Sequence, residues 1–172
     1  MDVVHRINEG YRALGVLESV LSNRQLGIKA KKCLYEGVIV PTALYRAEAW
    51  SMRSAERRKV NVLEMKGLRS LVGVSRMDRV RNEEVRWRAG IKRELASRAD
   101  HRVLRWFGHA ERMDEYWIAR RVLMAKVSGG RVHGRPRLGW MDGVNVAFRN
   151  KGMTVDNAQK IGKSAEPWYI YN

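Results

Sequence analysis

The sequence predicts an all-α protein, an irregular helical bundle with a basic Gly/Arg/Pro loop near residues 128–137. Apolar residues recur at helical spacing along most of the chain, and no alternating run is long enough for a central strand. Glycines stand where several of these helical runs end. We therefore expect a helical body over residues 1–127, the basic loop, and a C-terminal helical segment with a frayed end over 138–172.

The first two helices are expected from Val3 to Leu21 and from Ile28 to Val40, because apolar residues recur there at helical spacing. Pro41 follows directly and lacks a backbone N–H. It is therefore expected to end or kink the second helix.

A third helix is expected from Ser54, as N-cap, to about Val72, with Gly73 as its stop. One side carries its apolar residues: Val60, Leu63, Gly67, Leu68 and Leu71. The other side carries a basic ridge: Arg58, Lys59, Lys66 and Arg69. This segregation predicts one packed face and one face that can contact phosphates.

A fourth helix is expected over Asn82 to Ala89, ending at Gly90, and a fifth from about Glu94 to Arg112. The apolar face of the fifth helix consists of Leu95, Ala99, Val103, Trp106 and Phe107. Its basic stripe consists of Arg98, His101, Arg102, Arg105 and His109. Shorter helices are expected over Tyr116 to Lys126, Leu138 to Asn150 and Thr154 to Lys163.

The charge balance favours a polyanionic partner, since 34 Lys and Arg stand against 18 Asp and Glu, a net charge of +16. Arg exceeds Lys by 24 to 10, and the guanidinium fork suits phosphate and bases. The expected partners are therefore RNA, an RNA–DNA hybrid or DNA. No small-molecule substrate or cofactor is expected.

The cysteine count and the length of the apolar runs indicate where in the cell the protein is expected. Cys33 is the only cysteine, and no apolar run is long enough to span a bilayer or to act as an export signal. We therefore expect no membrane partner and a location in the nucleus or the cytoplasm.

No motif predicts catalysis. The four histidines lack metal-ligand spacing. Neither of the acidic doublets Glu83–Glu84 and Asp114–Glu115 can by itself hold two metals, because helical neighbours point about 100° apart. We therefore expect no metal site and no enzyme activity of the chain on its own. Trp87, between two arginines in "VRWRAG", is a candidate for stacking on an unpaired base, and a core or partner-helix role is equally open.

Five ordered segments resemble the region downstream of the catalytic core in reverse transcriptases of non-LTR (LINE-like) retrotransposons. They are "LYEGVIVPTALYRAEAW", "GLRSLVGVSRMDRVRNEEV", "VLRWFGHAERM", "GRPRLGWMD" and "MTVDNAQKIGKSAEPW". The resemblance implies a thumb-like body at residues 1–127, in a thumb and post-palm fragment that grips template–primer or element RNA. A separate reverse transcriptase catalytic core is an alternative partner. The palm motif of that family contains an Asp-Asp pair, and this chain has none.

Two departures from the family pattern suggest relaxed selection. Arg46 stands where the family usually has Gly, and this substitution disfavours a positive φ. "SAEP" replaces the usual Asp-Arg-x-x before Trp168.

Four interpretations of the chain are compatible with these observations. The leading one is a non-catalytic nucleic-acid-binding fragment that contacts phosphates. The alternatives are an accessory part of an active reverse transcriptase, a helix-turn-helix regulator with its turn at Ala89-Gly90-Ile91, and a translated pseudogene fragment without function.

The stretch "SGGRVHGRPRLGW" concentrates positive charge in a loop. From composition alone it is a flexible linker or a degenerate AT-hook. In the family context, Arg131, Arg135 and Arg137 are expected to act as a phosphate-gripping strap.

Overall fold

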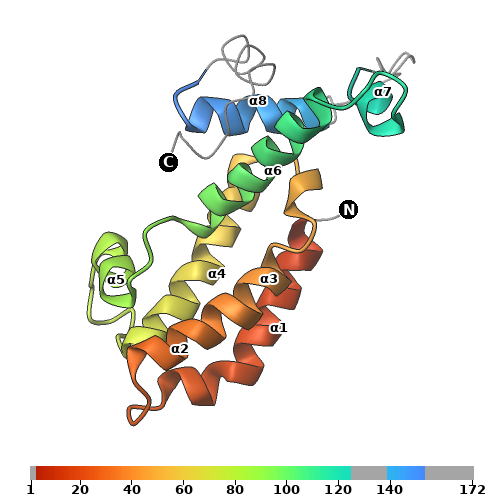
Figure 1. The fold of residues 1–172 in the computed structure, drawn as a ribbon. Helices are drawn as coiled ribbons and strands as arrows, with labels where there is room; N and C mark the ends of the chain where they lie inside the picture. Colours follow the sequence, from red (N-terminus) through yellow and green to blue (C-terminus); the bar gives the residue numbers. More distant parts are fainter. Residues whose placement is uncertain (1–2, 125–138, 154–172) are drawn as a thin grey trace. The chain divides into compact units, whose positions relative to one another are not determined.

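The computed structural model describes residues 3–124 and 139–153 (Figure 1). The regular elements of these residues are all helices, without a strand, which confirms the all-α prediction. Two compact units divide the chain: Met1–Ala47 with Met52–Ala99, and Glu48–Ser51 with Asp100–Asn172. The division falls inside a continuous helix. The expected borders beside the loop at 128–137 lie outside the described residues.

The first unit is built on α1 (Val3–Ser22) and α4 (Ser54–Val72), which pack against each other. Leu14 of α1 and Leu63 and Leu68 of α4 are buried in its core. Gly10 allows the close approach, because a Cβ there would lie 2.6 Å from Leu63 Cδ2. The apolar face predicted for α4 is confirmed, since all five of its residues are buried.

The second helical stretch does not end at Pro41. It runs as α2 (Ile28–Leu34), a π-helical segment η1 (Tyr35–Ile39) and α3 (Val40–Ala43). Pro41 cannot donate the usual hydrogen bond, and its ring crowds the carbonyl four residues earlier. The wider π-turn just before Pro41 relieves this conflict, so the helix continues with changed spacing.

The ends of α4 follow local rules. The predicted N-cap at Ser54 is wrong by one residue, since Arg53 takes the extended N-cap conformation and its N–H donates to Glu56 Oε2 at 2.7 Å. Gly73 ends the helix at φ 72°, as predicted. A 3-10 turn, η2 (Ala47–Ala49), precedes α4.

The next two helices closely match their predictions. α5 (Asn82–Ala89) ends at Gly90, whose φ is 66°. α6 (Leu95–Glu111) begins in the first unit and continues in the second. Leu95, Ala99, Val103 and Phe107 are buried, as expected for its apolar face.

The second unit has its own apolar core between α6 and α8 (Trp140–Asn150). Phe107 and Phe148 meet edge to face, with ring centroids 5.5 Å apart. Trp140 Nε1 donates to the carbonyl of Glu48 at 2.9 Å, which anchors α8 to the segment 48–51. α7 (Ile118–Met124) also belongs to this unit.

Candidate nucleic-acid interface

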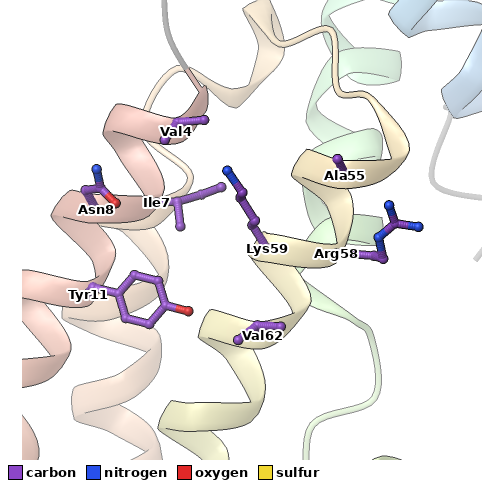
Figure 2. Close-up of a pocket in the computed structure, with 8 residues that line it drawn as sticks. All are labelled: Val4, Ile7, Asn8, Tyr11, Ala55, Arg58, Lys59 and Val62. Atoms are coloured by element: carbon purple, nitrogen blue, oxygen red, sulfur yellow. The ribbon is translucent and has the colours of Figure 1, made fainter.

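A groove runs between α1 and α4 on the surface of the first unit (Figure 2). Its volume is about 450 Å³. Its lining, which defines the α1–α4 groove, consists of Val4, Ile7, Asn8, Tyr11, Ala55, Arg58, Lys59 and Val62. The lining contains two cations and no carboxylate, so the groove suits an anion.

Three of the four predicted ridge residues of α4 lie in or beside this groove. Lys59 extends toward Ile7 of α1, whereas Arg58 extends to the other side of α4 (Figure 2). Lys66 Nζ lies 5.7 Å from the centroid of the Tyr11 ring. Arg58, Lys59 and Lys66 are all exposed. Burial raises the pKa of Tyr11 above its ordinary value of 10.0. A tyrosine hydroxyl is protonated at neutral pH even without this shift, so it can donate a hydrogen bond to an anion.

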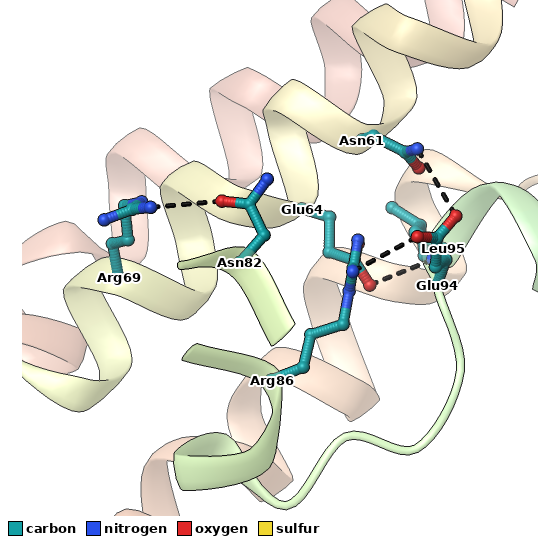
Figure 3. A network of polar contacts seen from close by, with 7 residues as sticks. All are labelled: Asn61, Glu64, Arg69, Asn82, Arg86, Glu94 and Leu95. Carbon is teal, nitrogen blue, oxygen red and sulfur yellow. Dashed lines mark hydrogen bonds and ion pairs between the residues drawn. The ribbon is translucent and has the colours of Figure 1, made fainter. Parts of the chain in front are cut away.

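Arg69, the fourth ridge residue, has an intramolecular role. Its guanidinium donates to the carbonyls of Ser75 (3.2 Å) and Val80 (2.8 Å), and to Asn82 Oδ1 (3.1 Å; Figure 3). These contacts tie the loop after α4 back to the helix. Arg69 therefore organises the connection to α5, and its role in phosphate binding stays a prediction.

A buried polar network joins α4 to α5 and to the start of α6 (Figure 3). Glu64 accepts hydrogen bonds from Arg86 Nη2 at 2.8 Å and from the backbone N–H of Leu95 at 2.9 Å. Arg86 Nη1 also pairs with Glu94 at 3.1 Å. Burial raises the pKa of Glu64, and the Arg86 hydrogen bonds and charge lower it without cancelling the effect.

Arg98, at the start of the predicted α6 stripe, forms a two-pronged ion pair with Glu36. Its two terminal nitrogens lie 3.0 and 2.6 Å from the two carboxylate oxygens. This pair links α6 to the π-helical segment η1. Because Glu36 offsets the charge of Arg98, this position contributes less positive field than the sequence suggests.

The rest of the α6 stripe lies in the second unit. Arg105 and His109 are exposed, while His101 and Arg102 are half-buried and make contacts within the protein. Trp106 is half-buried, and its ring lies 6.3 Å from that of Trp140. The sequence placed Trp106 in the core, and its real position is the border of the core.

Trp87 lies on the outer side of α5 with 76% of its surface exposed. Val85 and Ala89 of the same helix are buried and supply its packing face. The core alternative for Trp87 is therefore wrong, and its side chain is free to stack on a base or on a partner. Arg131, Arg135 and Arg137 lie outside the described residues, so the strap stays a prediction.

A second basic feature of the first unit, around Tyr45, was not predicted from the sequence. Arg6 and Arg46 both lie over the ring of Tyr45, with their Cζ atoms 4.6 and 5.5 Å from its centroid. Arg46 has φ 54°, a left-handed value that a glycine would adopt without strain. The sequence predicted that Arg would disfavour this conformation, and the backbone nevertheless adopts it.

The described residues offer neither a metal site nor a membrane span. They contain no group of three or more His, Cys, Asp or Glu side chains that could hold a metal ion. None of the described helices is long and apolar enough to cross a membrane.

Comparisons with known proteins give one relative of note. A transposon-derived protein of Caenorhabditis elegans is 26% identical over 148 residues, which cover 81% of this chain and 53% of that protein. The chain thus spans about half the length of the curated relative it matches. No family model and no solved structure matches it. The chain is therefore similar to a transposon-derived protein, which supports a transposon origin.

Proposed function

We propose that this chain is a non-catalytic nucleic-acid-binding part of a transposon-derived protein, of the retrotransposon reverse transcriptase kind. It grips template–primer or element RNA mainly through phosphates. The observation that carries the proposal is the α1–α4 groove, whose lining has no carboxylate. Lys59 extends into this groove, the Arg58 guanidinium points to the other side of α4, and Lys66 lies beside the groove over Tyr11 (Figure 2). The net charge of +16 supplies long-range attraction for the same ligand.

The chain does not polymerise by itself in this proposal. Its sequence contains no Asp-Asp pair of the kind that holds catalytic metals in the palm of the resembled family. A helix-turn-helix function is less well supported, because Arg98 near the start of α6 is held by Glu36 rather than presented to a groove of DNA.

The direct test measures binding to labelled single-stranded RNA, RNA–DNA hybrid and duplex DNA by fluorescence anisotropy at two salt concentrations. We expect affinity to fall with salt by about 0.7 to 0.9 power for each phosphate contacted, with little sequence preference. Absent or salt-independent binding would refute the proposal.

A matched pair of triple variants locates the contact. Neutralising Arg58, Lys59 and Lys66 to Gln should reduce the salt exponent by about two to three. The control variant neutralises Arg24, Lys29 and Arg76 to Gln. These residues are also exposed, and their substitution removes the same charge. Equal losses from both variants would show that net charge, and not the groove, drives binding.

A second candidate is an accessory role beside a separate polymerase core. It is favoured by the exposed apolar residues around α7, where Trp117, Ile118 and Val122 are 64%, 75% and 67% exposed. A primer-extension assay separates the two roles. Stimulation of a thumb-deleted core by this chain would support the accessory role, and unchanged extension would dismiss it.

A further inference from the structure

The most informative feature beyond the α1–α4 groove is the cluster of Arg6, Tyr45 and Arg46. Both guanidinium carbons lie within 5.5 Å of the centroid of one tyrosine ring. The ring itself remains accessible, since Tyr45 is 48% exposed. None of the three residues lines the α1–α4 groove, so the cluster is a separate surface feature of the first unit.

Arg46 occupies its place at a conformational cost. Its φ of 54° lies in the left-handed region, which is unfavourable for a residue with a Cβ. Strained residues of this kind persist where the surrounding structure holds them, and they concentrate at ligand-binding sites. The strain is thus a reason to examine what the Arg46 side chain does.

The position of the Arg6 side chain is also energetically unfavourable. Its Nε–H is buried and has no hydrogen-bond partner among the described residues. The acidic residue three positions further along α1, Glu9, is already engaged by Arg12 at 2.7 Å. The Arg6 guanidinium instead lies over the Tyr45 ring, with its Cζ atom 4.6 Å from the ring centroid.

Among the residues that the structure describes, no carboxylate forms an ion pair with the guanidinium of Arg6 or of Arg46. The face of an aromatic ring compensates a cation only partly, by about 0.5 to 1 kcal/mol at exposed sites. An anion with several acceptor oxygens would relieve the repulsion and use the donors of both forks.

We propose that the Arg6–Tyr45–Arg46 cluster binds a phosphate group. Two guanidinium forks and a tyrosine hydroxyl match the several oxygens of a phosphate better than they match an uncharged ligand. The phosphate can belong to a nucleic-acid strand, in which case the inference rests on the proposed function, or to a free phosphate compound. The same chemistry serves both.

The test uses two strained arginines of the same chain. Arg46 and Arg79 have φ values of 54° and 51°, both are exposed, and each loses one charge and its strain on substitution by Gly. Arg79→Gly is therefore the matched control for Arg46→Gly. We expect both variants to melt at a higher temperature than the parent protein, because Gly adopts this conformation freely.

The affinity for RNA should differ between Arg46→Gly and Arg79→Gly. Arg46→Gly should weaken affinity for labelled single-stranded RNA by about tenfold, whereas Arg79→Gly should change it by about twofold or less. Arg6→Gln, which leaves the backbone unaltered, should reproduce the loss. Equal affinities of the Arg46 and Arg79 variants would overturn the inference while leaving the groove intact.

Calorimetric titration with inorganic pyrophosphate keeps the two proposals apart. If the parent protein binds no RNA, the proposed function fails and the pyrophosphate titration decides the phosphate site. Pyrophosphate binding that Arg46→Gly abolishes and Arg79→Gly preserves would then support the site. Failure of the parent protein to bind either ligand would overturn both proposals.

Discussion

The guanidinium of Arg86 lies 2.8 Å from the carboxylate of Glu64, whose side chain is only 1% exposed. The pair joins α5 to α4, and the Leu95 N–H adds the start of α6 to the same carboxylate. The relative positions of these three helices in the first unit therefore depend on one buried acidic side chain. The α1–α4 groove is presented by the same helix, α4.

Removal of Arg86 should strongly destabilise the first unit. Arg86→Ala leaves the Glu64 carboxylate buried without its partner, which typically costs about 3 to 5 kcal/mol of unfolding free energy. Urea unfolding followed by circular dichroism measures this loss. The control is Arg88→Ala, which breaks the exposed pair with Glu84 and should cost less than about 1 kcal/mol. Similar losses for both variants would contradict the role assigned to Glu64.

The raised pKa of Glu64 predicts a specific pH dependence. The folded protein binds the Glu64 proton more tightly than the unfolded chain does, so unfolding free energy falls as pH rises from the ordinary value of 4.5 through the raised pKa. Glu64→Gln cannot titrate at this position. The stability of the parent protein relative to Glu64→Gln should therefore decrease across this window. A constant or increasing difference in unfolding free energy would refute the prediction.

Close packing at Gly143 predicts a loss of stability in the second unit. A Cβ at this position would lie 2.8 Å from the backbone Cα of Ser51, which cannot move aside as a side-chain end can. Gly143→Ala should therefore cost about 1 to 3 kcal/mol. Gly15→Ala in α1 is the contrast, because nothing lies within 4 Å of its Cβ. It should gain about 0.5 to 1 kcal/mol, and thermal melts compare the two variants.

Local patterns were sufficient to predict most of the helices. Gly73 and Gly90 end α4 and α5 where the sequence placed these ends, because a glycine in the left-handed conformation is a local signal. Of the two outcomes predicted at Pro41, an end or a kink of the helix, the end is wrong, because the cost of a proline depends on the path of the preceding turn. A π-helical turn over Tyr35–Ile39 accommodates it without ending the helix.

The candidate site was less predictable because partners far apart in sequence decide what a charge does. Arg98 and Glu36 are 62 residues apart, so helical periodicity could place Arg98 on a face without revealing its ion pair. Arg69 was assigned to a phosphate-binding ridge, and only the return path of the chain shows that it holds the loop after α4. Long-range pairing is not encoded in local spacing.

Exposure of Trp87 predicts a preference for unpaired bases. Trp87→Ala should reduce affinity for single-stranded RNA by about 1 to 3 kcal/mol and affect duplex DNA much less, because stacked base pairs do not offer a free face. Trp117→Ala removes another exposed tryptophan, which is 64% exposed and lies just before α7. Equal RNA affinities of the two variants would favour a protein-binding role for Trp87.

The strap predicts an effect on every nucleic acid tested. Replacing Arg131, Arg135 and Arg137 by Gln should weaken binding to all sequences. It should also lower the salt exponent by about two to three, because a variant that contacts fewer phosphates releases fewer counterions when it binds. Combining these changes with the Arg58, Lys59 and Lys66 substitutions tests whether strap and groove contact separate phosphates. Separate contacts give additive reductions of the salt exponent. If the strap variant binds as well as the parent protein, this stretch is only a linker. The α1–α4 groove and the exposed basic side chains of α6, Arg105 and His109, must then account for the binding.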